Sequence, residues 1–149
     1  MDRRDWVVAA QLGSLAGIAW PGRARWRLPA AAATAAGALT VAGAALSLAA
    51  AAAHGRRLTP RVTPPREAEL LTGGPYRVSR HPIYAGLLLA SGGVAVLRRR
   101  PEPLLAWTAL AAVLHVKAGM EETALRARFG RDYESYATRT PRLLGRPGR

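Results

Sequence analysis

The feature that most constrains this chain is one long stretch without charge. From Leu28 to Ala53, 26 consecutive residues carry no acidic or basic side chain. At about 1.5 Å per residue, a helix of about 20 such residues crosses the ~30 Å hydrocarbon core of a bilayer. A soluble helix of this length would carry a polar stripe at a 3.6-residue period, but this stretch offers only Thr34, Thr40 and Ser47. The stretch therefore predicts a transmembrane helix.

Three shorter uncharged runs accompany it, over Trp6–Trp20, Ile83–Leu97 and Pro103–Val116. The first is bracketed by tryptophans of the kind that lie at membrane interfaces. The last can lengthen if the helix continues past Lys117, because a lysine ammonium can reach the interface while its stem stays in apolar surroundings. We therefore expect an all-α integral membrane protein of four transmembrane helices, followed by a C-terminal cytoplasmic helical extension.

The basic residues of the chain are unevenly distributed between the predicted connections. The chain has 22 Lys+Arg against 9 Asp+Glu, a net charge of +13. Of the 22, 16 fall in the N-terminus, the 54–82 segment and the tail from 117, and the remaining six lie in the two other connections. The positive-inside rule then predicts that both termini, the middle segment and the tail are cytoplasmic. Since the arginines form no stripe interleaved with aromatics, we expect membrane lipid and no nucleic acid as a partner.

Several kinds of chemistry are excluded by composition or spacing. The chain has no cysteine, which rules out disulfides, thiolate ligands and a cysteine nucleophile. Its three histidines, His54, His81 and His115, have no zinc-ligand spacing, so we expect no metal site. The segment 54–66 is rich in proline and arginine and cannot be helical throughout. It divides the chain into an N-terminal helix pair, 1–53, and a second part, 54–149.

A first polar cluster runs from Gly73 to Gly86, with the sequence GGPYRVSRHPIYAG. Gly-Gly-Pro favours a turn, and Pro82 is suited to the first turn of the third predicted span. Arg80 and His81 would then lie at the N-terminus of that helix, where free N–H groups and the helix dipole attract anions. An arginine there can bind a carboxylate or phosphate with two hydrogen bonds. An ordinary interfacial turn with a snorkelling arginine fits the same spacing.

A second polar cluster follows the fourth run, over residues 121–142. Glu121 lies four residues after Lys117 and Glu122 four before Arg126, so ordinary helical ion pairs would satisfy both acids. Gly130 is expected to bend or interrupt the helix. Apolar and aromatic residues recur at helical spacing and predict packing against a neighbour or the bilayer surface. These are Leu125, Phe129, Tyr133 and Tyr136. With acids and tyrosines on the same membrane face as Arg80, the two clusters could hold a cationic small molecule between them.

The two clusters together resemble a known family. The motifs G-P-Y-x-x-x-R-H-P-x-Y-x-G and E-E-x-x-L-x-x-x-F-G-x-x-Y-x-x-Y-x-x-x-x-P-R, separated by an apolar hairpin, are similar to those of the isoprenylcysteine carboxyl methyltransferases and their phospholipid methyltransferase relatives. The resemblance covers about residues 58–144. It implies an integral membrane methyltransferase whose S-adenosylmethionine site is built by the 54–149 part at the cytoplasmic interface, with the first two helices outside the matched region.

The resemblance also implies roles for individual residues. One wall of the cofactor site would consist of Tyr76, Arg80, His81, Pro82, Tyr84 and Gly86. The other would consist of Glu121, Glu122, Tyr133 and Tyr136, with Arg142 in the closing Pro-Arg. Arg80 and Glu122 are the expected catalytic residues. Methyl transfer is an in-line displacement that needs positioning more than a protein nucleophile, so the missing cysteine and metal are no obstacle.

The resemblance leaves several methyl acceptors open. Carboxyl O-methylation of a hydrophobic or amphipathic acceptor is the leading expectation. The alternatives are N-methylation of a lipid amine, S-methylation of a small thiol, and a membrane scaffold without catalysis. Relatives commonly carry another basic residue close before the acidic pair, where this chain has Gly119. That departure leaves open how a substrate carboxylate would be held.

Overall fold

The described part of the chain is helical throughout its regular structure. The computed structural model describes residues 3–54 and 70–147, and the predicted irregular linker falls almost entirely outside them. In chain order the elements are α1 (Arg3–Ala19), α2 (Ala30–His54), the short 3₁₀ helix η2 (Gly74–Arg77), α3 (Pro82–Leu97), α4 (Pro101–Phe129) and α5 (Arg131–Arg139). The predicted all-α class is confirmed.

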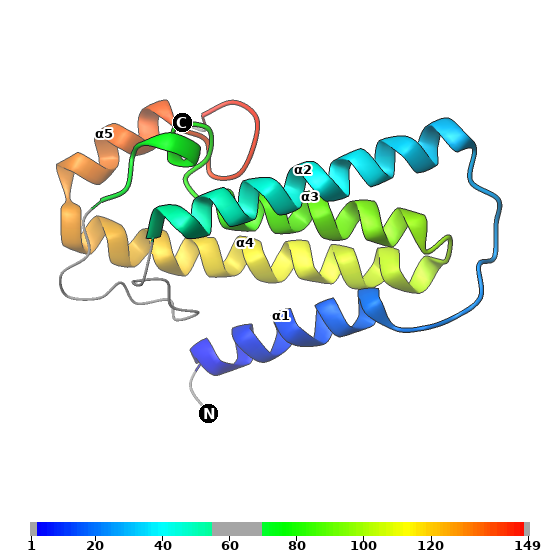
Figure 1. Cartoon of the computed structure of the whole chain (residues 1–149). Coiled ribbons are helices and arrows are strands. Elements are labelled where there is room, and N and C mark those ends of the chain that lie inside the picture. Colours follow the sequence, from blue (N-terminus) through cyan, green and yellow to red (C-terminus); the bar gives the residue numbers. More distant parts are fainter. Residues whose placement is uncertain (1–2, 55–69, 148–149) are drawn as a thin grey trace.

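The four long helices run in alternating directions (Figure 1). α2 packs on α3, α3 on α4, and α4 on α1, so α1 and α2 flank the α3–α4 pair. The start of α1, the end of α2, the start of α3 and the end of α4 lie at one end of the array, together with η2 and α5. The connections 20–29 and 98–100 lie at the opposite end (Figure 1). Four spans would require this alternation; the four spans and the cytoplasmic assignment both stay predictions.

Two of the helices are long and apolar enough to cross a membrane by length and composition. They are Ala30–Ala53 within α2, and α4. The apolar parts of α1 and α3, Asp5–Ala19 and Pro82–Leu97, are shorter. α4 extends well past the predicted run, because residues 117–129 are rich in Ala, Leu, Glu and Arg, which favour helix. The acidic pair therefore lies on α4, and the predicted extension corresponds to α5.

Small residues bring α2 and α3 into backbone contact. A Cβ added at Gly43 would lie 2.5 Å from the carbonyl oxygen of Gly86, and one added at Gly86 would lie 2.5 Å from that of Gly43. Ser47 donates a hydrogen bond of 2.9 Å to the carbonyl of Ile83. Such close approach through small residues is a common means of helix association in membranes. The glycine contact and the Ser47 hydrogen bond together fix the start of α3 against α2.

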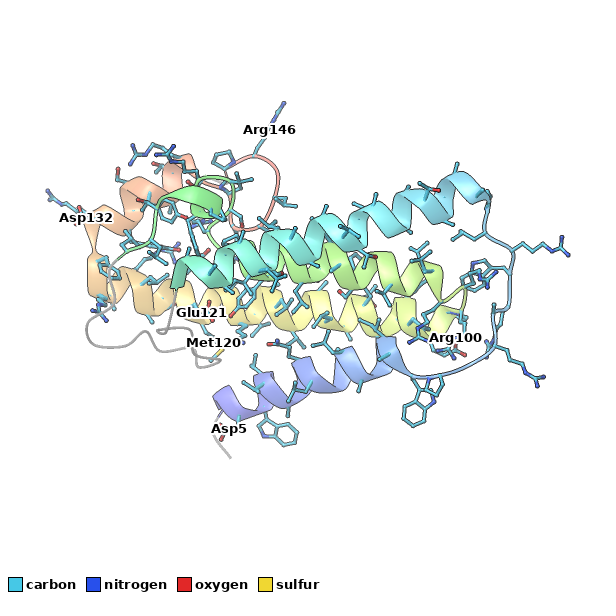
Figure 2. The ribbon with its side chains drawn as sticks, viewed as in Figure 1. Asp5, Arg100, Met120, Glu121, Asp132 and Arg146 are labelled. Carbon is cyan, nitrogen blue, oxygen red and sulfur yellow. The ribbon has the colours of Figure 1, made fainter. Side chains whose placement is uncertain are left out.

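Arginines close the other end of the array. Arg100, 6% exposed, occupies the N-cap position of α4, and its side chain donates to the carbonyls of Trp20 and Pro21 just after α1. Arg98 donates to the carbonyl of Ala19 at 2.8 Å. These carbonyls would otherwise lack partners at the end of α1. Figure 2 shows Arg100 at the start of α4 and Glu121 toward the other end of that helix, so Arg100 is remote from the acidic pair.

Candidate functional site

The two polar motifs meet at one end of the array. Pro82 is the first residue of α3, as predicted, and the loop before it runs beside the C-terminal segment. The amide of Arg80 donates to the carbonyl of Pro141 at 2.8 Å, and the amide of His81 donates to that of Arg142 at 3.1 Å. Ser79 adds a hydroxyl bond of 3.1 Å to the Arg142 carbonyl. The first motif is thus held against the end of the second.

Glu122 lies at the centre of this junction, and its side chain is fully buried. Arg142 binds it with two hydrogen bonds, 3.0 Å from Nε to Oε1 and 2.7 Å from Nη2 to Oε2. Nη1 of Arg80 lies 3.4 Å from Oε1, and Nη2 of Arg126 lies 3.6 Å from Oε2, the helical pair that the spacing predicted. A buried carboxylate requires such partners. Three arginine side chains lie around this one carboxylate, so the net charge of the junction is positive.

His81 connects the two acids. Its Nδ1 lies 3.3 Å from Oε2 of Glu121, and its Nε2 lies 3.4 Å from Oε1 of Glu122, without hydrogen-bond alignment in the second case. Its ring stacks on that of Tyr84, with centroids 5.5 Å apart, and the Tyr84 hydroxyl donates to Glu121. Burial lowers the pKa of His81, but the two carboxylates outweigh it and raise this pKa above its ordinary 6.5. The protonated imidazole is therefore favoured in the folded protein.

The two predicted tyrosines of α5 are buried and differ in their partners. Their rings meet edge to face, with centroids 6.2 Å apart. The Tyr136 hydroxyl donates to the carbonyl of Tyr76 at 2.6 Å and so fastens η2. The Tyr133 hydroxyl is buried and has no well-aligned hydrogen bond to the described residues, although the neighbouring Arg80 guanidinium acts to lower its pKa. Burial, and next the Glu122 carboxylate, raise the pKa of Tyr133. Nε of Arg80 is also buried and lacks a hydrogen bond within the described part of the chain.

The structure brings most of the predicted site residues together. They are Arg80, His81, Tyr84, Glu121, Glu122, Tyr133 and Arg142. Tyr76 and Tyr136 support the neighbouring turn, and Gly86 lies in the contact with α2. Their predicted contacts with a cofactor stay predictions, as do those of the other residues.

Sequence reasoning missed Ser79, which lies inside the first motif. Its hydroxyl accepts the amide N–H of His81 at 3.1 Å while donating to the tail. A serine three residues before the first residue of α3 is a common turn residue, and this was the available signal. The predicted ion pair between Lys117 and Glu121 is also replaced, since Lys117 donates instead to Gln11 of α1 at 3.0 Å.

The donor set suits a ligand that carries both signs of charge. Arg80, Arg142 and Tyr133 present buried or half-buried hydrogen-bond donors, which suit a carboxylate. Glu121, whose side chain is 20% exposed, offers a carboxylate beside aromatic rings, which suits a cation. S-adenosylmethionine has a carboxylate, an ammonium and a sulfonium, so the residues present fit this group.

Comparison with known proteins gives a consistent assignment. A family model described as phospholipid methyltransferase matches residues 31–132. The chain is 40% identical over 70 residues to a probable protein-S-isoprenylcysteine O-methyltransferase from Oryza sativa subsp. indica, covering 46% of this chain and 37% of the rice protein. It is 35% identical over 74 residues to protein-S-isoprenylcysteine O-methyltransferase B from Arabidopsis thaliana, covering 49% of this chain and 38% of that protein.

The matched region begins earlier than the motifs alone indicated. It includes almost all of α2, which the motif resemblance left outside and which packs directly on α3. The alignments reach well under half the length of the plant proteins. With most of the chain inside the family model and both motifs converging in space, the chain belongs to the phospholipid methyltransferase family of S-adenosylmethionine-dependent membrane methyltransferases.

Proposed function

We propose that this chain methylates the carboxylate of a hydrophobic or amphipathic acceptor with S-adenosylmethionine, at the cytoplasmic face of the membrane. The names of the plant relatives support the O-methylation of a carboxylate next to an isoprenyl chain. The apolar surfaces of α2 and α4 support an acceptor that reaches the site from the bilayer. Bound here, the cofactor would supply a sulfonium methyl, so that a carboxylate oxygen forms the new bond to carbon as the carbon–sulfur bond breaks and sulfur keeps the electron pair.

The proposal rests chiefly on the buried donors without partners. The Tyr133 hydroxyl and Nε of Arg80 lie near each other and have no well-aligned hydrogen bonds to the described residues, in a junction where cations exceed acids. Leaving a buried polar group unsatisfied costs about 1–3 kcal/mol, which a carboxylate-bearing ligand would recover. We propose that Arg80 and Tyr133 bind the carboxylate of the cofactor. Glu121, held by His81 and Tyr84, would face its positive end.

Glu122 has a different role in this proposal. Its carboxylate is fully buried and bound twice by Arg142, so it acts through the arginines that it positions. Arg80 is then the member of the expected catalytic pair that contacts the ligand. The protein contributes mainly by orienting two reactants and excluding water, an effect that reaches about 7–11 kcal/mol in favourable cases.

We further propose that all four long helices span the bilayer, with the site on the cytoplasmic side. The alternating directions of the helices and the excess of Lys+Arg in the segments at the site end support this topology. Cysteines introduced at Ser135, near the site, and at Ala24, in the far connection, would be labelled by an impermeant maleimide from opposite sides in oriented vesicles. Labelling of both from the same side would contradict the topology.

Calorimetric titration of the detergent-purified chain with S-adenosylmethionine and S-adenosylhomocysteine tests the cofactor site. Micromolar binding of both is expected. Tyr133→Phe should keep the stability of the wild type yet bind several-fold more weakly, because it removes a donor that only the ligand would satisfy. Ser91→Ala is the control: it removes a buried hydroxyl of α3 that bonds the carbonyl of Leu87 outside the site, and should leave affinity unchanged. Absence of binding by the folded wild type would instead favour a scaffold without catalysis.

The family description favours one competing acceptor, a phospholipid amine. The two products differ in chemical lability. After incubation with methyl-labelled cofactor and lipid extract, an ester releases its label as methanol in mild base, whereas a methylamine retains it. Base-stable label in the lipid fraction would support the amine and contradict the carboxylate. Label in a small thioether would indicate thiol methylation.

A further inference from the structure

Lys117 is the only lysine of the chain, and the proposed cofactor contacts do not use it. It lies on α4, one helical turn before Glu121, and is 4% exposed. Its ammonium donates to Oε1 of Gln11 on α1 at 3.0 Å. Figure 2 shows Glu121 and its neighbour Met120 on the part of α4 that lies near the first half of α1. Lys117 therefore lies inside the helix array, one turn farther along α4 from its C-terminal end than the acidic pair.

The ammonium is also connected to the proposed cofactor site. Its Nζ lies 5.2 Å from the centre of the Tyr84 ring, a cation–π contact. Tyr84 also stacks on His81 and donates a hydrogen bond from its hydroxyl to Glu121. A continuous series of contacts therefore runs from Glu122 through His81, Tyr84 and Lys117 to Gln11. It places the ammonium beside the site, on the side away from η2 and α5.

The positive charge of Lys117 is buried but has no paired carboxylate among the described residues. No carboxylate of the described residues lies within ion-pair distance of it, and Glu121 is already engaged by Tyr84 and His81. An ammonium has three N–H donors, of which one has an acceptor in Gln11, a neutral amide. A buried cation without a paired anion is expensive, and ionisable groups at membrane depth usually serve a ligand or an ion. A ligand anion would supply the missing charge.

We propose that Lys117, oriented by Gln11, binds the carboxylate of the methyl acceptor and so selects anionic over amine headgroups. The inference rests on the proposed function and specifies its substrate class. One carboxylate oxygen pairs with the ammonium and the other stays free to attack, while the apolar part of the acceptor remains in the bilayer. A protonated amine would be repelled by Lys117. In this proposal Lys117 supplies the cation for the substrate carboxylate that relatives have close before the acidic pair, where this chain has Gly119.

Two matched probes test this proposal: N-acetyl-S-farnesylcysteine and its carboxamide, which differ only at the carboxylate. Binding of each to the purified chain is measured with and without saturating S-adenosylhomocysteine. The wild type should bind the acid at least about tenfold more tightly than the amide, as expected for a charge-assisted hydrogen bond. Lys117→Met should bind the two alike, and Lys117→Arg should restore part of the preference. Arg128→Met, an exposed change on the same helix, should keep it.

Equal binding of the two probes by the wild type, or an acid preference that persists in Lys117→Met, would overturn the proposal. Failure of the proposed function is distinguishable, because it would appear as absent S-adenosylhomocysteine binding while the acid and amide can still be compared without it. If Lys117→Met does not fold, acylation of the wild type by an amine-reactive ester replaces it. The acid should then protect Lys117 several-fold more than the amide does, with the N-terminal amine as internal reference; equal protection would overturn the proposal.

Discussion

Arg142 and Glu122 form a two-point ion pair that joins the C-terminal segment to α4. The two hydrogen bonds, 3.0 and 2.7 Å long, connect residues that are 20 positions apart in the chain. The carbonyl of the same arginine accepts the amide of His81 and the hydroxyl of Ser79. Arg142 therefore holds the loop before α3 through its backbone and α4 through its side chain.

Glu122→Gln should destabilise the protein strongly, because it removes the only negative charge among the described residues that Arg80 and Arg142 share, while both arginines remain in place. Breaking a buried ion pair from one side costs about 3 kcal/mol or more. Reversible unfolding by SDS in mixed micelles measures the loss. Glu134→Gln, an exposed change on α5, should stay within about 0.5 kcal/mol of the wild type. Equal stabilities of the two variants would contradict the central role of Glu122.

Gly43→Ala should weaken the contact between α2 and α3. The added methyl group would lie 2.5 Å from the carbonyl of Gly86, so the helices must separate, at a cost of about 1–3 kcal/mol. Gly37→Ala, on the same helix, meets nothing within 4 Å and should be neutral or gain up to about 1 kcal/mol from helix propensity. Thermal unfolding of both variants in detergent distinguishes these effects; a Gly43→Ala variant as stable as Gly37→Ala would argue against backbone contact.

Gly130→Ala should destabilise the junction between α4 and α5. Gly130 has φ 50° and ψ −121°, a conformation that other residues adopt only with strain of about 1–3 kcal/mol. Gly119→Ala provides the comparison, because Gly119 lies within α4 with open space at its Cβ position. We expect a lower unfolding temperature for the first variant and an equal or higher one for the second. The reverse order would show that α4 continues through Gly130.

The contribution of His81 to stability should decrease as the pH rises. The pKa of His81 is higher in the folded protein than its ordinary 6.5, so its stabilising contribution is complete below 6.5 and is lost as the pH rises through the folded value. His81→Gln removes this titration. The stability difference between wild type and His81→Gln, measured from pH 5 to pH 9, should therefore be largest in acid. A difference that grows toward high pH would mean that the neutral imidazole is the bound form.

The parts of the fold that sequence alone could predict are those with local causes. The uncharged run from Leu28 to Ala53 corresponds to α2, Pro82 begins α3, and Gly130 separates the last two helices. The convergence of the two polar motifs followed from the alternation of spans, and the structure shows it at one end of the array.

The parts that sequence could not predict depend on contacts between distant segments. The glycine contact between α2 and α3 joins Gly43 to Gly86, and nothing in the sequence around either glycine indicates that the two are in contact. Lys117 is four residues from an acid, which favours an ordinary helical pair, yet its acceptor is Gln11 on a helix that is remote in the chain. The sequence also left open whether the fourth helix continues past Lys117, and the structure extends α4 to Phe129, because its polar residues end the apolar surface and leave the helix intact.

The placement of α1 and α2 on opposite flanks of the α3–α4 pair bears on how the chain assembles. The first two helices leave the ribosome before their packing partners exist, and in the finished array each is held mainly by one member of the later pair. They cannot settle against each other and still admit α3 and α4 between them. The later-made hairpin therefore takes its place between two helices that are made before it, and the order of synthesis and the order of packing are different.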